Sequence, residues 1–177
     1  MKGRVYMVDK VKKEIVIDKK KSDIVGIVVW LVSTAITFTI QKLIHGMVFI
    51  YPNYLMPLIV FLPIILHEPL HHLGFILNGV NSKDLTIKRY KGLLPNVRPK
   101  GSIEAGAYIR ALLLPNVVIP LTFLVMVIVS DSIIYSLTLG LAICMTVIDF
   151  FAIQGLKSFE KGYKVGCLED KFGFYIE

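Results

Sequence analysis

The chain has 177 residues, of which 55% are hydrophobic, with a mean hydropathy of +0.67 and a formal net charge of +7. This composition is too apolar for an ordinary soluble domain, and long stretches carry almost no charge, which is the pattern of a polytopic helical membrane protein. The two cysteines, Cys144 and Cys167, exclude a disulfide framework, and neither stands in a C-x-x-C pair.

The first 22 residues are rich in polar and charged side chains, and they are predicted to form a cytoplasmic tail. No small-residue cleavage site follows the first apolar run, so a cleavable signal peptide is not expected. Apolar and polar residues alternate in 5–8 and again in 14–17. This alternation favours a short hairpin, with a disordered tail as the alternative.

Four apolar runs follow, each close to the roughly 20 residues that a bilayer requires. They predict an all-α membrane domain over residues 23–156. Its four spans cover about Ile24 to at least Ile40, about Tyr54–Asn78, about Ile109–Ser130 and about Ile133–Leu156. Residues 157–177 are predicted to be a second cytoplasmic tail.

The segment between the second and third spans carries its own pattern. Residues 85–90 read as a strand, Lys91 and Gly92 as a turn, and residues 93–97 as a second strand before Pro99. The sequence therefore predicts a short β-hairpin in a cytoplasmic or re-entrant loop.

The basic residues fix the expected orientation. Eight Lys and Arg precede residue 22, seven lie between Lys83 and Arg110, four lie from Lys157 onward, and Lys42 stands alone. With four membrane spans, the first three groups of basic residues lie on the same side of the cell membrane. That side is therefore predicted to be the cytoplasmic one. No aromatic-interleaved basic array is present, so the charge indicates contact with the lipid bilayer and not with nucleic acid.

The second span contains the motif H-E-x-x-H at residues 67–71. Residues four apart share one helix face, so His67 and His71 can reach a single Zn²⁺ ion. Glu68 then stands beside the metal, where it can take a proton from water. Ionisable groups at bilayer depth are costly and usually functional, which favours a zinc site over histidines that pack without metal.

A catalytic zinc needs a further protein ligand, and Asp149 is the best candidate. It is the only carboxylate in the fourth span. It lies seven residues before Leu156, as His71 lies seven before Asn78. At about 1.5 Å rise per residue both are roughly 10 Å from the same end of their helices.

Three other polar residues are weaker candidates. His72 points about 100° away from His71 around the helix, so packing is the more probable role than metal binding. His45 is expected at the far interface. Asn116 lies between Pro115 and Pro120 at similar depth and is predicted to bind substrate, with helix–helix contact as an equally good reading.

These motifs resemble the site-2 protease class of intramembrane metalloproteases, and more closely the small four-span proteins called putative zincin peptidases. The matching segments are 67–74, the strand-like loop, 110–115, Asp149 and 168–173. The resemblance implies a zinc held by two His and an Asp, a Glu acid/base and a hairpin near the site. In site-2 proteases the late Asp is followed by Gly and preceded by an Asn-x-x-Pro element. Here Phe150 follows Asp149, which favours the smaller relatives.

The sequence therefore predicts a membrane zinc metalloprotease that hydrolyses peptide bonds of a membrane protein or peptide substrate. His67, His71 and Asp149 would hold zinc, and Glu68 would be the general base and acid. The alternative is a non-enzymatic protein that binds or transports a divalent metal, in which Glu68 would be a ligand.

Overall fold

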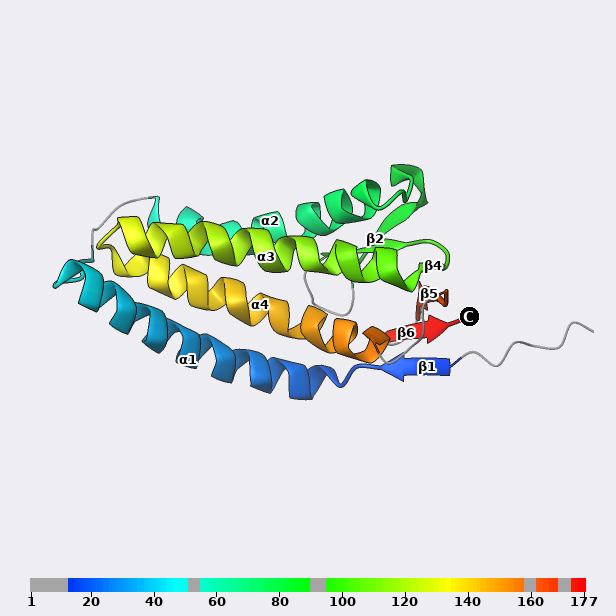
Figure 1. Ribbon diagram of the computed structural model, residues 1–177, viewed down its shortest axis with the longest axis horizontal. Coiled ribbons are helices and arrows are strands. Elements are labelled where there is room, and N and C mark those ends of the chain that lie inside the picture. Colours follow the sequence, from blue (N-terminus) through cyan, green and yellow to red (C-terminus); the bar gives the residue numbers. More distant parts are fainter. Residues whose placement is uncertain (1–12, 51–54, 90–94, 158–161, 169–172) are drawn as a thin grey trace, which may run out of the picture.

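The computed structural model describes residues 13–50, 55–89, 95–157, 162–168 and 173–177, and four long helices dominate it (Figure 1). They are α1 (Lys19–His45), α2 (Met56–Leu77), α3 (Ala105–Val129) and α4 (Ile133–Lys157). Each is long and apolar enough to cross a membrane. The predicted fold class, a helical membrane protein with four spans, is confirmed.

Two helices begin earlier than the apolar runs suggested. α1 starts at Lys19 because the Asp18 side chain accepts a hydrogen bond from the Lys21 amide, which caps the first turn. The first-turn lysines are kept on the helix by this cap and by an ion pair between Lys19 and Asp23 at 2.6 Å. α3 starts at Ala105, directly after the strand that ends at Glu104, so the small residues 105–107 and Tyr108 add one turn before the predicted span.

Helix α4 is the centre of the bundle and packs against α1, α3 and α2, while α2 also packs against α3 (Figure 1). Small residues allow the close approaches. A Cβ atom on Gly140 of α4 would lie 2.0 Å from the Thr34 hydroxyl of α1, and one on Gly74 of α2 would lie 2.8 Å from the Ala111 carbonyl oxygen of α3. Small residues at helix contacts are typical of membrane bundles.

The predicted hairpin is present as β2 (Leu85–Arg89) and β3 (Pro95–Pro99), which pair antiparallel with Ile87 opposite Val97. A 3₁₀ turn, η1 (Ser82–Asp84), precedes it. The described part of the second strand begins at Pro95, because residues 93 and 94 lie outside the described residues. The predicted turn at Lys91 and Gly92 lies outside the described residues.

A four-stranded sheet joins the two ends of the chain. Its order is β1 (Lys13–Val16), β6 (Gly173–Ile176), β5 (Lys164–Cys167) and β4 (Ile103–Glu104), all antiparallel. The strand that was expected to form a local hairpin therefore pairs with the C-terminal segment. Residues 5–8, its expected partner, lie outside the described residues.

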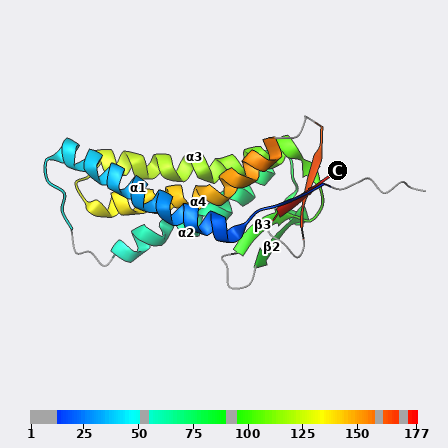
Figure 2. The ribbon, with the colours of Figure 1, turned by 90° about the horizontal axis from the view of Figure 1, so that it is seen from below.

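Both small sheets and both described ends of the chain lie at the same end of the helical bundle (Figures 1 and 2). Buried side chains from the hairpin, α2, α3, α4 and the four-stranded sheet form one core cluster there, which includes Leu85, Val97, Phe75, Tyr108 and Phe174. The strands thus pack as a cap on the end of the bundle.

Candidate metal centre

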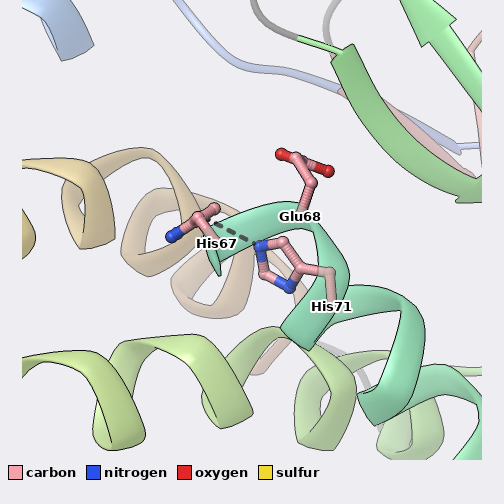
Figure 3. Close-up of side chains that lie close together, drawn as sticks. All are labelled: His67, Glu68 and His71. Carbon is pink, nitrogen blue, oxygen red and sulfur yellow. Dashed lines mark hydrogen bonds between the residues drawn. The ribbon is translucent and has the colours of Figure 1, made fainter. Parts of the chain in front are cut away.

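The two motif histidines lie on the buried face of α2. His67 and His71 are one helical turn apart, and only 5% and 4% of their surfaces are exposed. Their Nε2 atoms are 3.0 Å apart and their rings meet edge to face (Figure 3). The spacing of the motif has therefore placed two imidazole nitrogens at one point inside the bundle.

Asp149 of α4 reaches the same point. Its Oδ2 atom lies 3.2 Å from His67 Nε2 and 3.1 Å from His71 Nε2, and the residue is 7% exposed. The structure thus brings together the three side chains that were predicted as metal ligands. The equal depth estimated from the two helix ends accounts for this meeting, since α2 and α4 pack against each other.

The backbone of α3 orients one of the imidazoles. His71 Nδ1 lies 3.2 Å from the Ala111 carbonyl oxygen, to which it donates a hydrogen bond when it carries the ring proton. The neutral ring then presents the lone pair of Nε2 towards His67 and Asp149. Gly74, one turn further along α2, permits this contact because its missing side chain lets α2 lie against Ala111.

Glu68 is held beside the histidines by the hairpin. Its Oε2 atom accepts a 2.7 Å hydrogen bond from the Val97 amide of β3. One carboxylate oxygen lies within 4.8 Å of the ligand nitrogens of His67 and His71. Figure 3 shows the side chain extending away from the paired imidazoles. Glu68 is therefore near the histidines, with one oxygen already engaged.

The donor set fits a zinc ion. Tetrahedral zinc with nitrogen and oxygen ligands at about 2.0–2.1 Å keeps neighbouring ligand atoms about 3.3 Å apart. The three atoms of His67, His71 and Asp149 are 3.0–3.2 Å apart. With His71 protonated at Nδ1, its Nε2 and the Asp149 oxygen are both acceptors, so one shared proton cannot satisfy all three atoms. A cation between them can.

The weaker candidates lie apart from this cluster. His72 Nε2 is 3.2 Å from the Ser82 hydroxyl oxygen, and His45 Nε2 is 3.3 Å from the Val127 carbonyl oxygen. Asn116 is half-buried, and its Oδ1 atom has no hydrogen-bond partner among the described residues. No described contact joins Asn116 to the metal centre, so its substrate role stays a prediction.

Sequence reasoning missed two side chains next to the centre. Arg98 and Tyr108, both 4% exposed, line a cavity of about 20 Å³ together with His71 and Asp149. That volume is about the size of one water molecule. The sequence offered one signal for the position of Arg98, because polar and apolar residues alternate in 85–88 and again in 95–100, which puts Thr86, Lys88, Asn96 and Arg98 on one face of a hairpin.

Comparison with known proteins agrees with this picture. Residues 58–163 match the model of a family described as "Putative zincin peptidase". No curated protein and no solved structure matches the chain. Together with the His-Glu-x-x-His group, this match indicates a zinc metalloprotease with several membrane spans. Because the match covers more than half of its length, the chain belongs to the putative zincin peptidase family.

Proposed function

We propose that this protein is an integral membrane zinc metallopeptidase that hydrolyses peptide bonds within or close to the bilayer. The observation that carries the proposal is the convergence of His67, His71 and Asp149 within 3.2 Å, with Glu68 beside them. The three converging side chains would hold the zinc, and Glu68 would serve as general base and acid.

The roles of the residues follow from their contacts. Zinc, when bound, supplies a Lewis acid that makes water acidic near neutral pH and polarises a peptide carbonyl. The Val97 amide holds Glu68 Oε2, so Oε1 is the oxygen available to accept a proton from the attacking water. Glu68 then gives this proton to the leaving amine nitrogen. Ala111 keeps His71 in the tautomer that leaves Nε2 free to bind.

The engagement of Glu68 favours a hydrolase over a protein that binds or carries a metal ion. A carrier would use the carboxylate of Glu68 as a ligand, with an oxygen turned towards the ion between the imidazoles. Here Oε2 is bound to the hairpin, whereas the Asp149 oxygen contacts both imidazole nitrogens. This division suits one carboxylate as ligand and the other as acid/base.

The site would lie near the cytoplasmic face of the cell membrane. Apart from Lys42, the described Lys and Arg lie in the strands and their connections or within two turns of the helix ends beside them, and such an excess is typical of the cytoplasmic side. Both chain ends would then be cytoplasmic. A zinc site inside a helical bundle beside a hairpin also supports a mechanistic kinship with site-2 proteases.

The test distinguishes the residues that bind the metal from the residue that transfers the proton. We expect purified Glu68→Gln to retain zinc and lose hydrolysis of a transmembrane peptide by at least about 100-fold, because only the proton acceptor is removed. His71→Ala should lose both zinc and hydrolysis. If Glu68→Gln lost zinc as fully as His71→Ala, Glu68 would be a ligand and the metal-carrier function would gain.

A further inference from the structure

A second cavity lies behind the metal centre, on the polar face of the hairpin. This cleft has a volume of about 240 Å³ and is lined by Thr86, Lys88, Arg98, Lys100 and Cys167, with Pro99 and Leu168 completing its wall. The lining contains three cationic side chains and no carboxylate among the described residues. None of the proposed catalytic residues lines it.

The strand register explains why the cations gather there. Thr86 stands opposite Arg98, and Lys88 stands opposite Asn96, so these even-numbered side chains share one face of the hairpin. That face is turned towards β5, because Arg98 Nη1 donates a hydrogen bond to the Leu168 carbonyl oxygen at 3.3 Å. The apolar residues Leu85 and Val97 pack into the core on the other side.

Arg98 and Lys100 each donate hydrogen bonds to neutral groups. Arg98 is 4% exposed and its Nε atom donates to the Asn96 side-chain oxygen at 3.1 Å. Lys100 Nζ donates to the Lys83 carbonyl oxygen at 2.6 Å. Lys88 and Lys100 form no ion pair with any described residue. Their charges are therefore available to an anion from outside.

The field in the cleft also acts on Cys167. Burial raises the pKa of its thiol, while the Tyr108 hydroxyl and the charges of Arg98 and Lys88 oppose that rise. The positive charges of Arg98 and Lys88 thus act on a thiol that lines the same cleft. An anionic group bound there would be surrounded by one buried guanidinium, two ammonium groups and the Thr86 hydroxyl.

Arg98 connects this cleft to the metal centre, because it also lines the small cavity beside His71 and Asp149. The cleft and the small cavity beside His71 and Asp149 therefore share one wall, so a group bound in the cleft would lie close to the metal centre. No residue of the four long helices lines the cleft within the described part of the chain. A lipid headgroup site is expected at a helix flank, where the acyl chains can lie along the bundle, so the lining favours a peptide.

We propose that this cleft binds an acidic side chain of the peptide substrate, next to the segment that reaches the metal centre. The inference rests on the proposed peptidase function and adds a substrate class to it, namely peptides with a carboxylate near the scissile bond. Lys88 and Lys100 would attract and select the carboxylate, at the end of the hairpin where Arg98 also lines the cavity beside the metal centre.

The experiment measures binding apart from catalysis. Zinc-loaded Glu68→Gln protein in a non-ionic detergent is titrated into two fluorescent apolar peptides, one with a cluster of glutamates and one with glutamines in their place. We expect the glutamate peptide to bind about tenfold more tightly at low salt. The advantage should vanish in Lys88→Gln/Lys100→Gln. It should persist in the matched control Lys157→Gln/Lys164→Gln, which removes two exposed lysines outside the cleft.

An equal loss of the advantage in both double variants would overturn the proposal, because general charge would then account for it. Competition by phosphatidylglycerol nanodiscs that depends on Lys88 and Lys100 would assign the cleft to lipid headgroups and also overturn it. Hydrolysis of the same peptides by the wild type separates the two claims. Equal cleavage of both peptides would reject the acidic substrate class alone. Cleft-dependent binding without any cleavage would reject the peptidase function alone.

Discussion

Two polar clusters are buried between the apolar helices, and they differ in how their hydrogen bonds are satisfied. The first joins α1 to α4: Gln41 Nε2 donates to the carbonyl oxygens of Ser130 and Ser132 at 2.7 and 2.9 Å. The Ser136 hydroxyl donates to Gln41 Oε1 at 2.8 Å. Gln41 and Ser136 are both fully buried.

The side chains of the metal centre are buried to a similar degree, but they do not satisfy one another's hydrogen bonds. His67, His71 and Asp149 place three atoms that need a proton or a cation within 3.2 Å of one another. The amide of Gln41 brings as many donors and acceptors as its partners need, whereas the centre is short of positive charge. A buried polar cluster at membrane depth is therefore structural when its members satisfy one another's hydrogen bonds. It is functional when its acceptors need a bound cation.

Removal of zinc should have the largest effect, and only at the centre. Because zinc binds the folded centre, chelation should lower the free energy of unfolding by about 4 kcal/mol when free zinc had been near a thousand times its dissociation constant. Thermal unfolding in detergent, with and without zinc, measures this loss. Zinc should stabilise the Gln41→Ala variant by the same amount as the wild type. A smaller stabilisation by zinc in the variant would mean that the two clusters are coupled.

The Asp149→Asn variant tests the third ligand. It keeps the size of the side chain and removes the charge, so zinc affinity should fall by at least about 100-fold, or about 2.7 kcal/mol. Competition with a chromophoric chelator measures the affinity. The control is His72→Ala, whose ring contacts Ser82 outside the centre. Zinc retained in Asp149→Asn and lost in His72→Ala would show that the wrong ligand had been chosen.

The Gln41→Ala variant tests the structural cluster. The Ser136 hydroxyl and two carbonyl oxygens lose their partner, so we expect a loss of stability of about 1–2 kcal/mol with unchanged zinc affinity. Thr39→Ala is the matched control, because this exposed α1 hydroxyl bonds only within its own helix, to the Ala35 carbonyl oxygen. A loss of zinc in Gln41→Ala would contradict the division between the clusters.

The Gly74→Ala variant should lower the stability by about 1–3 kcal/mol, because the added methyl would lie 2.8 Å from the Ala111 backbone carbonyl oxygen and push α3 away. The displacement also weakens the hold on His71, so zinc affinity should fall several-fold. Gly79→Ala is not a suitable comparison because its φ of 86° strains any side chain. Gly101→Ala, with open space around the added atom, is the control. Equal zinc affinity in the two variants would remove the orienting role of Ala111.

The parts of the fold that depend on local pattern were predictable. Apolar runs of bilayer length predicted the four helices, and alternation predicted the hairpin strands. The i, i+4 spacing put His67 and His71 on one face, and counting residues from the helix ends put Asp149 at the same depth. Each inference needs only helix geometry and the cost of charge in lipid.

The parts that depend on distant pairing were not predictable. β1 pairs with β6 from the opposite end of the chain, and no local signal fixes that register. The bond from the Val97 amide to Glu68 involves a backbone donor, which leaves no mark in the sequence. In the sequence, Arg98 has the features of an ordinary loop cation. It is buried only because the hairpin packs against β5.

The central claim is that three converging side chains form a zinc site. Metal analysis of the detergent-purified wild type, together with the His67→Ala/His71→Ala variant, tests it most directly. We expect about one zinc per chain in the wild type and none above background in the variant. A wild-type protein that contains no zinc and cannot be reconstituted with it, or a variant that keeps its zinc, would contradict the account.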